Sequence, residues 1–338
     1  MKVYAGIDLH SSNNYVGIIN DQDQRLYGKR LPNRLNDVLM ALEPFKDNLE
    51  GVVVESTYNW YWLVDGLEEH GYKLHLANPS AVKQYEGLKH TDDKWDSFWV
   101  SHLLRLNILP EGYIYPKEER PVRDLLRRRL LFVRHRTAHI LSLESMITRN
   151  LGIRISGNRI KTIREADIEK MFDQPQLVFA AKNSIAVIRF LTEKIKGIEK
   201  EVISQIKLRE EFKNLLTITG IGDILGLTIM LEVGDINRFP KVGNYSSYCQ
   251  CVKSERLSDG KKKGENNRKN GNKYLAWAYV EAANFAIRHC PKAQRFYQRK
   301  KDKTNEIVAI KALSNKLARA SYYVMRDQVP YDANKLFD

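Results

Sequence analysis

Four acidic residues are spaced so that their carboxylates could share a metal site. Two of them close short apolar runs, residues 3–7 and 51–54, which are typical of buried strands. The other two lie three residues apart, so a helix would place them on one face. The four are Asp8, Glu55, Asp93 and Asp96. Carboxylates are the ligands that Mg²⁺ prefers, and two ions roughly 3.5–4 Å apart can clamp a phosphodiester. The pattern therefore predicts metal-dependent phosphodiester chemistry, with Mg²⁺ or Mn²⁺.

Each acid also has an ordinary structural interpretation. Asp8 could simply end a strand, and Glu55 could cap the following helix. Asp93 and Asp96 could be a solvated pair favoured by the dipole at a helix N-terminus. Asp92 lies four residues before Asp96 and shares the same face, so spacing alone does not separate Asp92 from Asp93. The combination of two strand-end acids with a paired acid favours a common site.

The residues around Asp8 also resemble the first phosphate loop of actin-like ATPases and sugar kinases. That loop needs a glycine directly after the Asp-x pair, so that backbone amides can approach the nucleotide phosphates. His10 stands at this position, and no later glycine-rich phosphate loop follows. The kinase interpretation is therefore rejected.

The acids must be positioned by a sheet, and residues 1–117 have the alternating pattern of an α/β domain. We expect strands near 3–8, 14–20, 24–31, 51–55 and 73–77, with helices over 34–45, 59–70 and 94–107. An acid at the C-terminal end of a strand faces the crevice where α/β sheets bind ligands.

Residues 118–208 change to long helical patterns, over 120–149 and about 177–207. The first helix has a strong excess of arginine, which predicts a phosphate-binding face. Its candidate contacts are Arg123, Arg127, Arg128 and Arg134. The second helix balances its charges and is typical of a coiled-coil or bundle partner. We expect this helical region to mediate dimerisation, nucleic-acid contact, or both.

The last part, residues 209–338, begins with Gly220-Ile221-Gly222 between two helix-forming stretches. This could be a helix-hairpin-helix turn that grips a phosphate, or close helix packing at Gly220; both interpretations stay open. Residues 253–273 lose periodicity and are rich in lysine, arginine, glycine and asparagine. They predict a flexible loop that contacts nucleic acid. Its candidate contacts are Lys261, Lys262, Lys263, Arg268 and Lys269.

The composition agrees with a polyanionic partner, because the 338 residues carry a net charge of +14. The three cysteines, Cys249, Cys251 and Cys290, have no metal-ligand spacing with the histidines, and we expect reduced packing residues. No signal peptide or apolar span of bilayer length is present in the sequence. We expect a soluble, cytoplasmic protein without a membrane partner.

Four segments together resemble the DEDD transposases, the insertion-sequence recombinases that a bridge RNA guides. The segments are residues 6–10, residues 91–97 leading into 103–105, Gly220–Gly222 with Phe239-Pro240, and residues 257–260 followed by 269–275. The resemblance runs nearly end to end. It implies a RuvC-like domain of ribonuclease H fold (1–117), a helical coiled-coil insert (118–208) and a mainly helical C-terminal transposase domain (209–338).

The resemblance also implies roles for single residues. The metal ligands would be Asp8, Glu55, Asp93 and Asp96, and Ser258 would be the serine nucleophile, with Ser254 as the fallback. Two departures stand out: Ser97 follows the fourth acid where the family usually has alanine, and Asp259 is inserted between Ser258 and Gly260. The implied partners are the element ends and target DNA, a guide RNA, and further copies of the chain in a dimer or tetramer.

Three functions are therefore weighed. The first is an RNA-guided DNA recombinase, in which a serine alkoxide would conserve bond energy in a covalent protein–DNA intermediate. The second is a RuvC-like metal-dependent nuclease or junction resolvase, in which the serine is incidental. The third is a non-catalytic nucleic-acid-binding protein, against which the strand-end acids argue.

Overall fold

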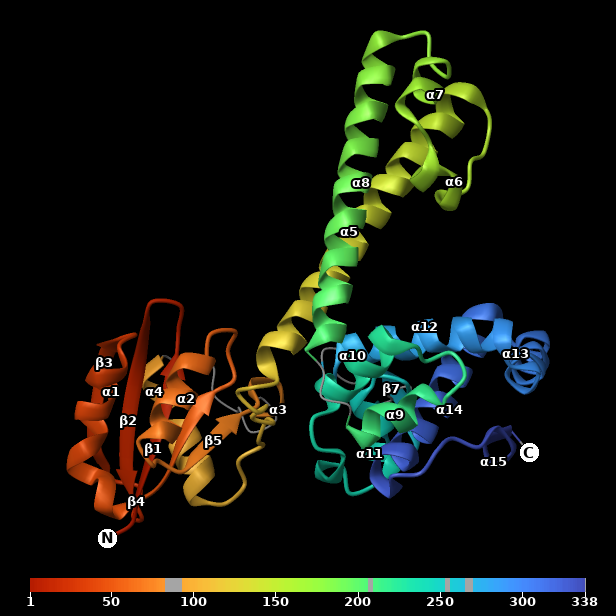
Figure 1. The fold of residues 1–338 in the computed structure, drawn as a ribbon. Coiled ribbons are helices and arrows are strands. Elements are labelled where there is room, and N and C mark those ends of the chain that lie inside the picture. The colour runs from red at the N-terminus through yellow and green to blue at the C-terminus, as the bar shows by residue number, and fades with distance from the viewer. Residues whose placement is uncertain (83–92, 206–208, 253–255, 265–269, 338) are drawn as a thin grey trace. The chain divides into compact units, whose positions relative to one another are not determined.

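The computed structural model describes residues 1–82, 93–205, 209–252, 256–264 and 270–337. The chain forms two compact units, Met1–Lys117 and Glu118–Asp338. The first unit is an α/β structure and the second is mainly helical (Figure 1). Among the described residues, no helix combines the length and the apolar character needed to cross a bilayer.

The first unit is built on a five-stranded sheet with the order β3-β2-β1-β4-β5. The strands β1, β2 and β3 pair antiparallel, whereas β4 pairs parallel to β1 and β5 pairs parallel to β4. Their bounds are Val3–Leu9, Asn13–Asn20, Arg25–Pro32, Leu49–Glu55 and Leu74–Ala77. All five strands were expected from the sequence, and each lies close to its predicted bounds.

The two faces of this sheet carry different helices because side chains alternate along a strand. On one face Val3, Ile7 and Leu9 are buried in a core that also contains Val38 and Leu63. The helices on that face are α1 (Leu35–Leu42), which runs into the 3-10 turn η1 (Glu43–Asn48), and α2 (Tyr61–Glu69). The opposite face carries α4 (Asp93–Arg105), while the short α3 (Pro79–Val82) follows β5.

A row of three glycines allows α4 to lie directly on the sheet. Gly6, Gly17 and Gly28 stand opposite one another in the register of β1, β2 and β3. A Cβ at Gly6 would lie 2.1 Å from the backbone oxygen of Ser97, and one at Gly17 would lie 2.6 Å from the Ser97 hydroxyl. No real Cβ tolerates such distances, so α4 could not occupy this position over larger residues. The glycine row thereby brings the acids at the start of α4 down to the level of the strand ends.

The second unit begins with two long helices, α5 (Arg120–Leu151) and α8 (Pro175–Ser204), which pack against each other (Figure 1). Both were expected from their apolar periodicity. Two short helices between them, α6 (Gly157–Thr162) and α7 (Glu165–Glu169), were not expected. Together these four helices enclose a small core around Ile147, Ile168 and Ile185.

The remaining helices of this unit surround a larger core that includes Leu126 of α5 and Val202 of α8. They are α9 (Glu210–Leu216), α10 (Asp223–Val233), α11 (Val242–Tyr248), α12 (Lys273–His289), α13 (Pro291–Lys303), α14 (Glu306–Asp327) and α15 (Ala333–Phe337), with the turn η3 (Ile236–Arg238). Because α5 and α8 contribute to this core, the predicted boundary between residues 208 and 209 stays a prediction. Cys249 and Cys251 are buried and all three cysteines are unbonded thiols, as expected.

The basic segment contains a β-hairpin, so the expectation of a loop without regular secondary structure is wrong for residues 256–264, while its flexibility stays a prediction. Strand β6 (Arg256–Ser258) pairs antiparallel with β7 (Lys261–Gly264). The connecting residues Asp259 and Gly260 have φ values of 52° and 66°. Two successive left-handed residues are typical of a type I′ hairpin turn, for which Asp-Gly is a favoured sequence. Residues 253–255 and 265–269 lie outside the described part of the chain.

Candidate metal site and nucleic-acid surfaces

Three potential metal ligands meet at the end of β1. The Nε2 atom of His10 lies 3.0 Å from Oδ2 of Asp8 and 3.0 Å from Oδ1 of Asp93. One ligand atom from each of these residues falls within 4.8 Å of the other two. Asp8 is almost completely buried, Asp93 is partly buried and His10 is the most exposed. The two acids had been expected to meet, whereas His10 had not been proposed as a ligand.

The position of His10 follows from strand periodicity. Asp8 and His10 are two residues apart and thus point to the same side of the chain, the side on which Gly6 contacts α4. Asp93 opens α4 and reaches them from above this face. The Asp-x-His spacing at the end of an apolar strand was therefore the signal that could have identified the third ligand.

Glu55 and Asp96 complete the set of predicted acids. Glu55, at the end of β4, shares a hydrogen bond with Asp8, so the two strand-end acids do meet. Asp96 lies one turn after Asp93 in α4 and is partly buried, but it is not among the three clustered ligands. Asp92 lies outside the described residues. Of the two candidates for the third ligand, the structure therefore describes Asp93, which lies in the cluster.

The two clustered carboxylates are held in opposite electrostatic environments. Burial raises the pKa of Asp8, and the negative charge of Asp93 raises it further, although hydrogen bonding to Glu55 and the charge of His10 act against this. The pKa of Asp93 is lowered, chiefly because Arg30 donates a hydrogen bond of 2.5 Å to its Oδ2 atom. The site thus holds one carboxylate whose ionised form is disfavoured and one whose ionised form is secured.

The unsatisfied atoms of this cluster fit a bound cation. Among the described residues, neither Oδ2 of Asp8 nor Nε2 of His10 has a hydrogen-bond partner of acceptable geometry, although both are buried atoms. Nearly all buried polar atoms in native proteins are paired, and exceptions need an explanation. A cation between an imidazole nitrogen and two carboxylates would satisfy both atoms and would favour the ionised form of Asp8.

The backbone next to this cluster is fixed by asparagine side chains. The carbonyl oxygen of His10 accepts hydrogen bonds of 2.9 Å from both Asn33 and Asn59. Asn33 follows β3 and Asn59 precedes α2, so two separate connections anchor the end of β1. Arg30 also donates to Asn13, which ties its guanidinium between β2 and Asp93. Such support of the ligand-bearing backbone is typical of sites that need fixed geometry.

Two residues of the predicted arginine face of α5, Arg123 and Arg127, form ion pairs inside the unit. Arg123 is only 6% exposed, and its guanidinium contacts the carboxylate of Glu232 in α10. Arg127 donates to both oxygens of the same carboxylate, at 2.5 and 2.8 Å, and lies over the ring of Tyr274. Both guanidinium groups therefore pair with one carboxylate inside the unit and link α5 to α10.

Glu232 is the centre of a satisfied polar network. Asn272 also donates to it, at 2.7 Å, and uses its own side-chain oxygen to cap the start of α12. Burial alone would raise the pKa of Glu232, but the hydrogen bond from Arg127 and the charges of both arginines outweigh burial and lower it. The network joins α5, α10 and α12 through one ionised carboxylate.

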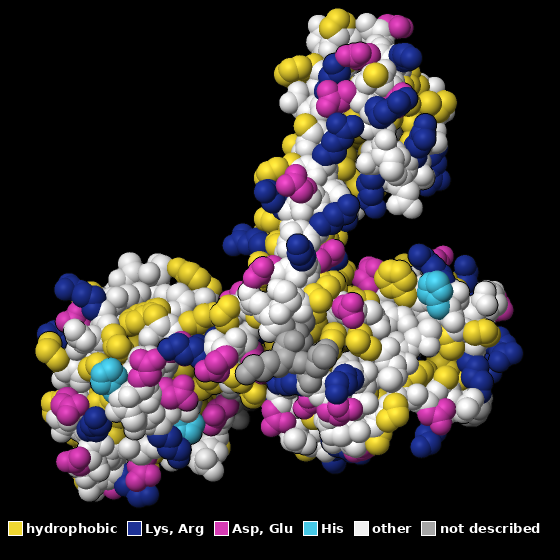
Figure 2. All heavy atoms as spheres, in the orientation of Figure 1, with side chains coloured by type: hydrophobic (Ala, Val, Ile, Leu, Met, Phe, Trp, Pro, Cys, Tyr) yellow, Lys and Arg dark blue, Asp and Glu magenta, His cyan; other side chains and the backbone are white. Residues whose placement is uncertain are grey.

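Other basic side chains do lie on the surface. Arg128 and Arg134 of α5 are exposed, as are Lys261, Lys262 and Lys263 of the hairpin, whereas Arg268 and Lys269 lie outside the described residues. Figure 2 shows further lysine and arginine side chains over the lobe of α6 and α7 and over α13. The sequence of α13 is strongly basic, with Arg295, Arg299 and Lys303 exposed, and it was not singled out from the sequence.

Ser258 and Gly220 lie in two separate turns of the second unit. Ser258 ends β6, is exposed, and stands opposite Lys261 at the hairpin turn, so the inserted Asp259 forms part of that turn. Gly220 has a φ of 102°, and a Cβ there would lie 2.3 Å from the backbone oxygen of Ala282. This contact demonstrates close packing of the α9–α10 connection against α12. A phosphate-binding role for the same turn stays a prediction.

Comparison with known proteins decides the class of this chain. Residues 5–150 match a DEDD transposase family model of the IS110 type, and residues 212–298 match the family described as "Transposase IS116/IS110/IS902 family". The chain is a DNA transposase, and two of its ranges are similar to models of IS110-type transposases. A similar curated protein is the "Probable family 20 transposase" of Pseudomonas aeruginosa, 23% identical over 282 residues, which cover 80% of this chain and 82% of that protein.

The two matched ranges divide the candidate residues of the transposase. The first range contains all four predicted acids together with His10, and the second contains Ser258 and Glu232. The ligand cluster of Asp8, His10 and Asp93 and the hairpin of Ser258 therefore lie in two different matched ranges. Use of a divalent metal agrees with the DEDD type of the first part and with the cluster at Asp8, His10 and Asp93.

Proposed function

We propose that this transposase is an RNA-guided recombinase that cleaves and rejoins DNA with a metal site at Asp8, Glu55, Asp93 and Asp96 and a nucleophile at Ser258. The observation that carries the proposal is the ligand cluster at the end of β1, where two buried polar atoms lack hydrogen-bond partners among the described residues. The strand order 3-2-1-4-5, with acids at the ends of the central strands, supports a ribonuclease H-like assignment for this unit.

Asp8, Asp93 and His10 would hold a divalent ion, and Glu55, which hydrogen-bonds Asp8, and Asp96, one turn after Asp93, would extend the site. Mg²⁺ suits the carboxylates, and Mn²⁺ also suits the imidazole of His10. When bound, such an ion stabilises the charge that develops on a phosphodiester. The role of the chain is to secure the ligands: Arg30 keeps Asp93 ionised, and Asn33 and Asn59 hold the backbone of His10.

Ser258 would provide the covalent step. Its Oγ atom attacks the phosphorus of the scissile phosphodiester, an Oγ–P bond forms, and the P–O bond to one deoxyribose breaks. The serine proton passes to the leaving deoxyribose hydroxyl, so no high-energy cofactor is required. A second DNA hydroxyl then reverses the step and releases the serine. The exposed position of Ser258 at a tight turn, beside Lys261, supports access to a phosphate.

The serine step is tested by trapping. The transposase, a candidate RNA and a suicide DNA substrate are incubated with Mg²⁺ and then denatured, and we expect a protein–DNA band that is absent in Ser258→Ala and retained in Ser254→Ala. A band that disappears only in Ser254→Ala would move the nucleophile to Ser254. Cleaved DNA without any adduct would favour the metal-dependent nuclease instead, in which water attacks the phosphorus.

The guide RNA and the oligomer are further parts of the proposal. The net charge of +14 and the exposed Arg128 and Arg134 support binding of a polyanion in addition to DNA. Replacing both arginines by glutamine should make the salt dependence of RNA binding shallower, by up to about 0.9 log unit per lost duplex phosphate contact. Sequencing RNA that co-purifies with the transposase identifies the guide, and light scattering distinguishes a dimer from a tetramer.

A further inference from the structure

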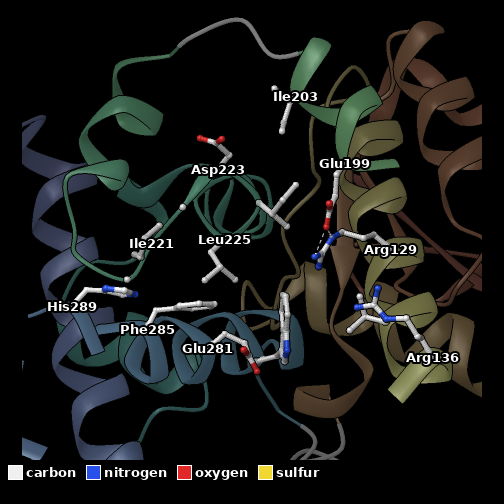
Figure 3. A pocket seen from close by; sticks show the side chains of 15 residues that line it. Arg129, Arg136, Glu199, Ile203, Ile221, Asp223, Leu225, Glu281, Phe285 and His289 are labelled. Atoms are coloured by element: carbon white, nitrogen blue, oxygen red, sulfur yellow. Dashed lines mark hydrogen bonds and ion pairs between the residues drawn. The ribbon is translucent and has the colours of Figure 1, made fainter. Parts of the chain in front are cut away.

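A pocket of about 600 Å³ lies inside the second unit, away from the ion-paired Glu232. It is lined by α5, α8, the connection before α10 and one face of α12 (Figure 3). Pockets of this size with mostly apolar walls and a few convergent polar groups are the usual form of a small-molecule or base-binding site.

One wall of the pocket is a stripe of α12 in which every fourth residue points into the cavity. The stripe consists of Trp277, Glu281, Phe285 and His289. Residues four apart share a helix face, and the opposite face of α12 is buried through Ala278, Ala282 and Ala286. Trp277 packs partly against the core, whereas Phe285 is 42% exposed, and both side chains line the cavity. Two aromatic side chains with a carboxylate between them are thus open to an occupant.

The facing wall carries two arginines in different states. Arg129 donates to Glu199 at 2.8 Å and is satisfied. Arg136 reaches Thr192 through one nitrogen, but its buried Nε atom has no hydrogen-bond partner among the described residues. Burial lowers the pKa of Arg136, and the charge of Arg129 acts in the same direction. An acceptor on an occupant would satisfy this buried donor.

The charges of the lining exclude a simple phosphate site. Arg129 and Arg136 are matched by Glu199, Asp223 and Glu281 on the same lining, so the pocket is not a positive cavity. A flat, uncharged ring with donors on one edge and acceptors on the other fits these walls better. Unpaired nucleobases have this character, and proteins bind them by stacking on aromatic side chains and hydrogen bonding to their edges.

From these contacts we propose that the pocket binds one unpaired guanine of a bound nucleic-acid strand. Trp277 and Phe285 stack on the ring, and the carboxylate of Glu281 accepts from the adjacent N1–H and N2–H groups. Guanine alone among the common bases presents two adjacent donors to a carboxylate, while its O6 and N7 atoms are acceptors for Arg136. The inference rests on the proposed nucleic-acid function, but it concerns base recognition and is independent of strand cleavage.

The test uses single-stranded oligonucleotides and full-length transposase without divalent metal, so that no cleavage is required. A thymine 11-mer is compared with the same strand carrying one central guanine, and a uracil 11-mer is compared with its guanine counterpart. We expect about tenfold tighter binding of the guanine strand in at least one pair. The pair with the larger ratio shows whether DNA or RNA supplies the base.

Variants of the pocket and matched controls decide the assignment. Glu281→Gln, which removes the charged acceptor for the two guanine donors, should reduce the guanine preference to nearly onefold. Phe285→Leu, which removes a stacking surface, should weaken binding of the guanine strand several-fold. Glu193→Gln and Phe190→Leu, exposed residues of α8 that do not line this pocket, should retain the preference. Unfolding midpoints measured beside each titration exclude loss of structure, and Phe285→Leu is the milder variant because its side chain is partly exposed.

The outcomes separate this inference from the proposed recombinase function. A wild-type protein without guanine preference, or a Glu281→Gln variant that keeps it, overturns the guanine pocket. Asp8→Asn should lose cleavage and keep the preference. A transposase that prefers guanine but never cleaves DNA leaves the pocket in place and contradicts only the proposed function. Crosslinking of a 6-thioguanine strand to the peptide containing Trp277 or Phe285 provides a second, variant-free confirmation.

Discussion

Two buried carboxylates, Asp8 in the first unit and Glu232 in the second, show how similar groups come to have different roles. Both side chains are almost fully buried. Glu232 accepts hydrogen bonds from two arginines and an asparagine, and its pKa is lowered. Asp8 faces a second acid and a histidine, has an unsatisfied oxygen among the described residues, and its pKa is raised. A satisfied network stabilises the fold, whereas an unsatisfied one is prepared for a ligand.

The largest effect on activity is expected from a substitution of Asp8. We expect Asp8→Asn to reduce DNA cleavage by at least about a thousandfold, which corresponds to about 4 kcal/mol of activation free energy. The fold should not weaken, because the variant removes a buried charge that lacks a complete set of partners. Cleavage rates with Mg²⁺ and with Mn²⁺, together with urea unfolding, measure both effects. Normal cleavage by this variant would contradict the metal site.

The second carboxylate should show the reverse result. Glu232→Gln removes the buried negative charge that pairs with Arg123 and Arg127, and we expect it to lower the free energy of unfolding by about 3–5 kcal/mol. The matched control is Glu306→Gln, an exposed glutamate in the first turn of α14, which should change stability by less than about 0.5 kcal/mol. A stable Glu232→Gln protein would show that the arginines find other partners.

The difference in stability between wild type and Glu232→Gln should depend on pH, because the pKa of Glu232 is lowered in the folded protein. A depressed pKa in the folded state gives a stabilisation that is fully present above the pKa of an unfolded glutamate, about 4.3. This stabilisation decreases as the pH falls below that value, and it is lost when the pH has fallen below the lower pKa of Glu232 in the folded state. The stability difference between wild type and Glu232→Gln should therefore be constant above about pH 5 and shrink in more acidic solution.

The distance between α4 and the sheet can be changed without replacing a carboxylate. Gly17→Ala places a methyl group against Ser97 and Phe98, and we expect a loss of about 1–3 kcal/mol of stability. Cleavage should fall as well, because Asp93 and Asp96 move with α4. Adding Ser97→Ala should restore part of both losses, since it removes the hydroxyl nearest to the new methyl group. Gly197→Ala, at an open position of α8, is the control and should not reduce either quantity.

The smallest effect on cleavage is expected from removing the hydrogen bond that Arg30 donates to Asp93. Arg30→Gln removes the guanidinium that hydrogen-bonds this carboxylate, and loss of such a supporting partner typically weakens metal binding by about 10–100-fold. Raising the Mn²⁺ concentration should recover cleavage in this variant but not in Asp8→Asn. Titration of activity against Mn²⁺ measures the shift, and an unchanged midpoint would remove Arg30 from the site.

The sequence predicted the sheet and the acids because both depend on local pattern. Alternating and continuous apolar runs mark the strands, and an acid at a strand end needs no distant information. In the sequence, His10 served only to reject a kinase phosphate loop, which needs glycine at that position. Its spacing from Asp8 already placed both side chains on one face of the strand. The fate of Arg123 could not be read from α5, because its partner Glu232 lies 109 residues further along the chain. Charge excess on a helix does not reveal which charges a later helix will neutralise.

The hairpin at Ser258 shows a different limit. The Asp-Gly pair is a strong turn signal, but the neighbouring lysines lack the alternating apolar residues that usually accompany a strand. The structure has two paired strands around a two-residue turn, where a loop without strands was expected. The guanine pocket was likewise invisible in sequence, since its walls come from four separate segments between residues 129 and 289.

The glycine row also has a consequence for how this chain can diverge. Gly6, Gly17 and Gly28 face one helix, and the atoms that limit them belong to Ser97, Val100, Ser101, Phe98 and Tyr15. A larger residue at any one position is tolerated only if a residue of α4 becomes smaller or the helix is displaced. In an alignment of relatives, position 17 should therefore vary together with position 97, and position 28 together with position 98. The small side chain at 97 would then be inherited as the partner of Gly17 rather than as a neighbour of Asp96.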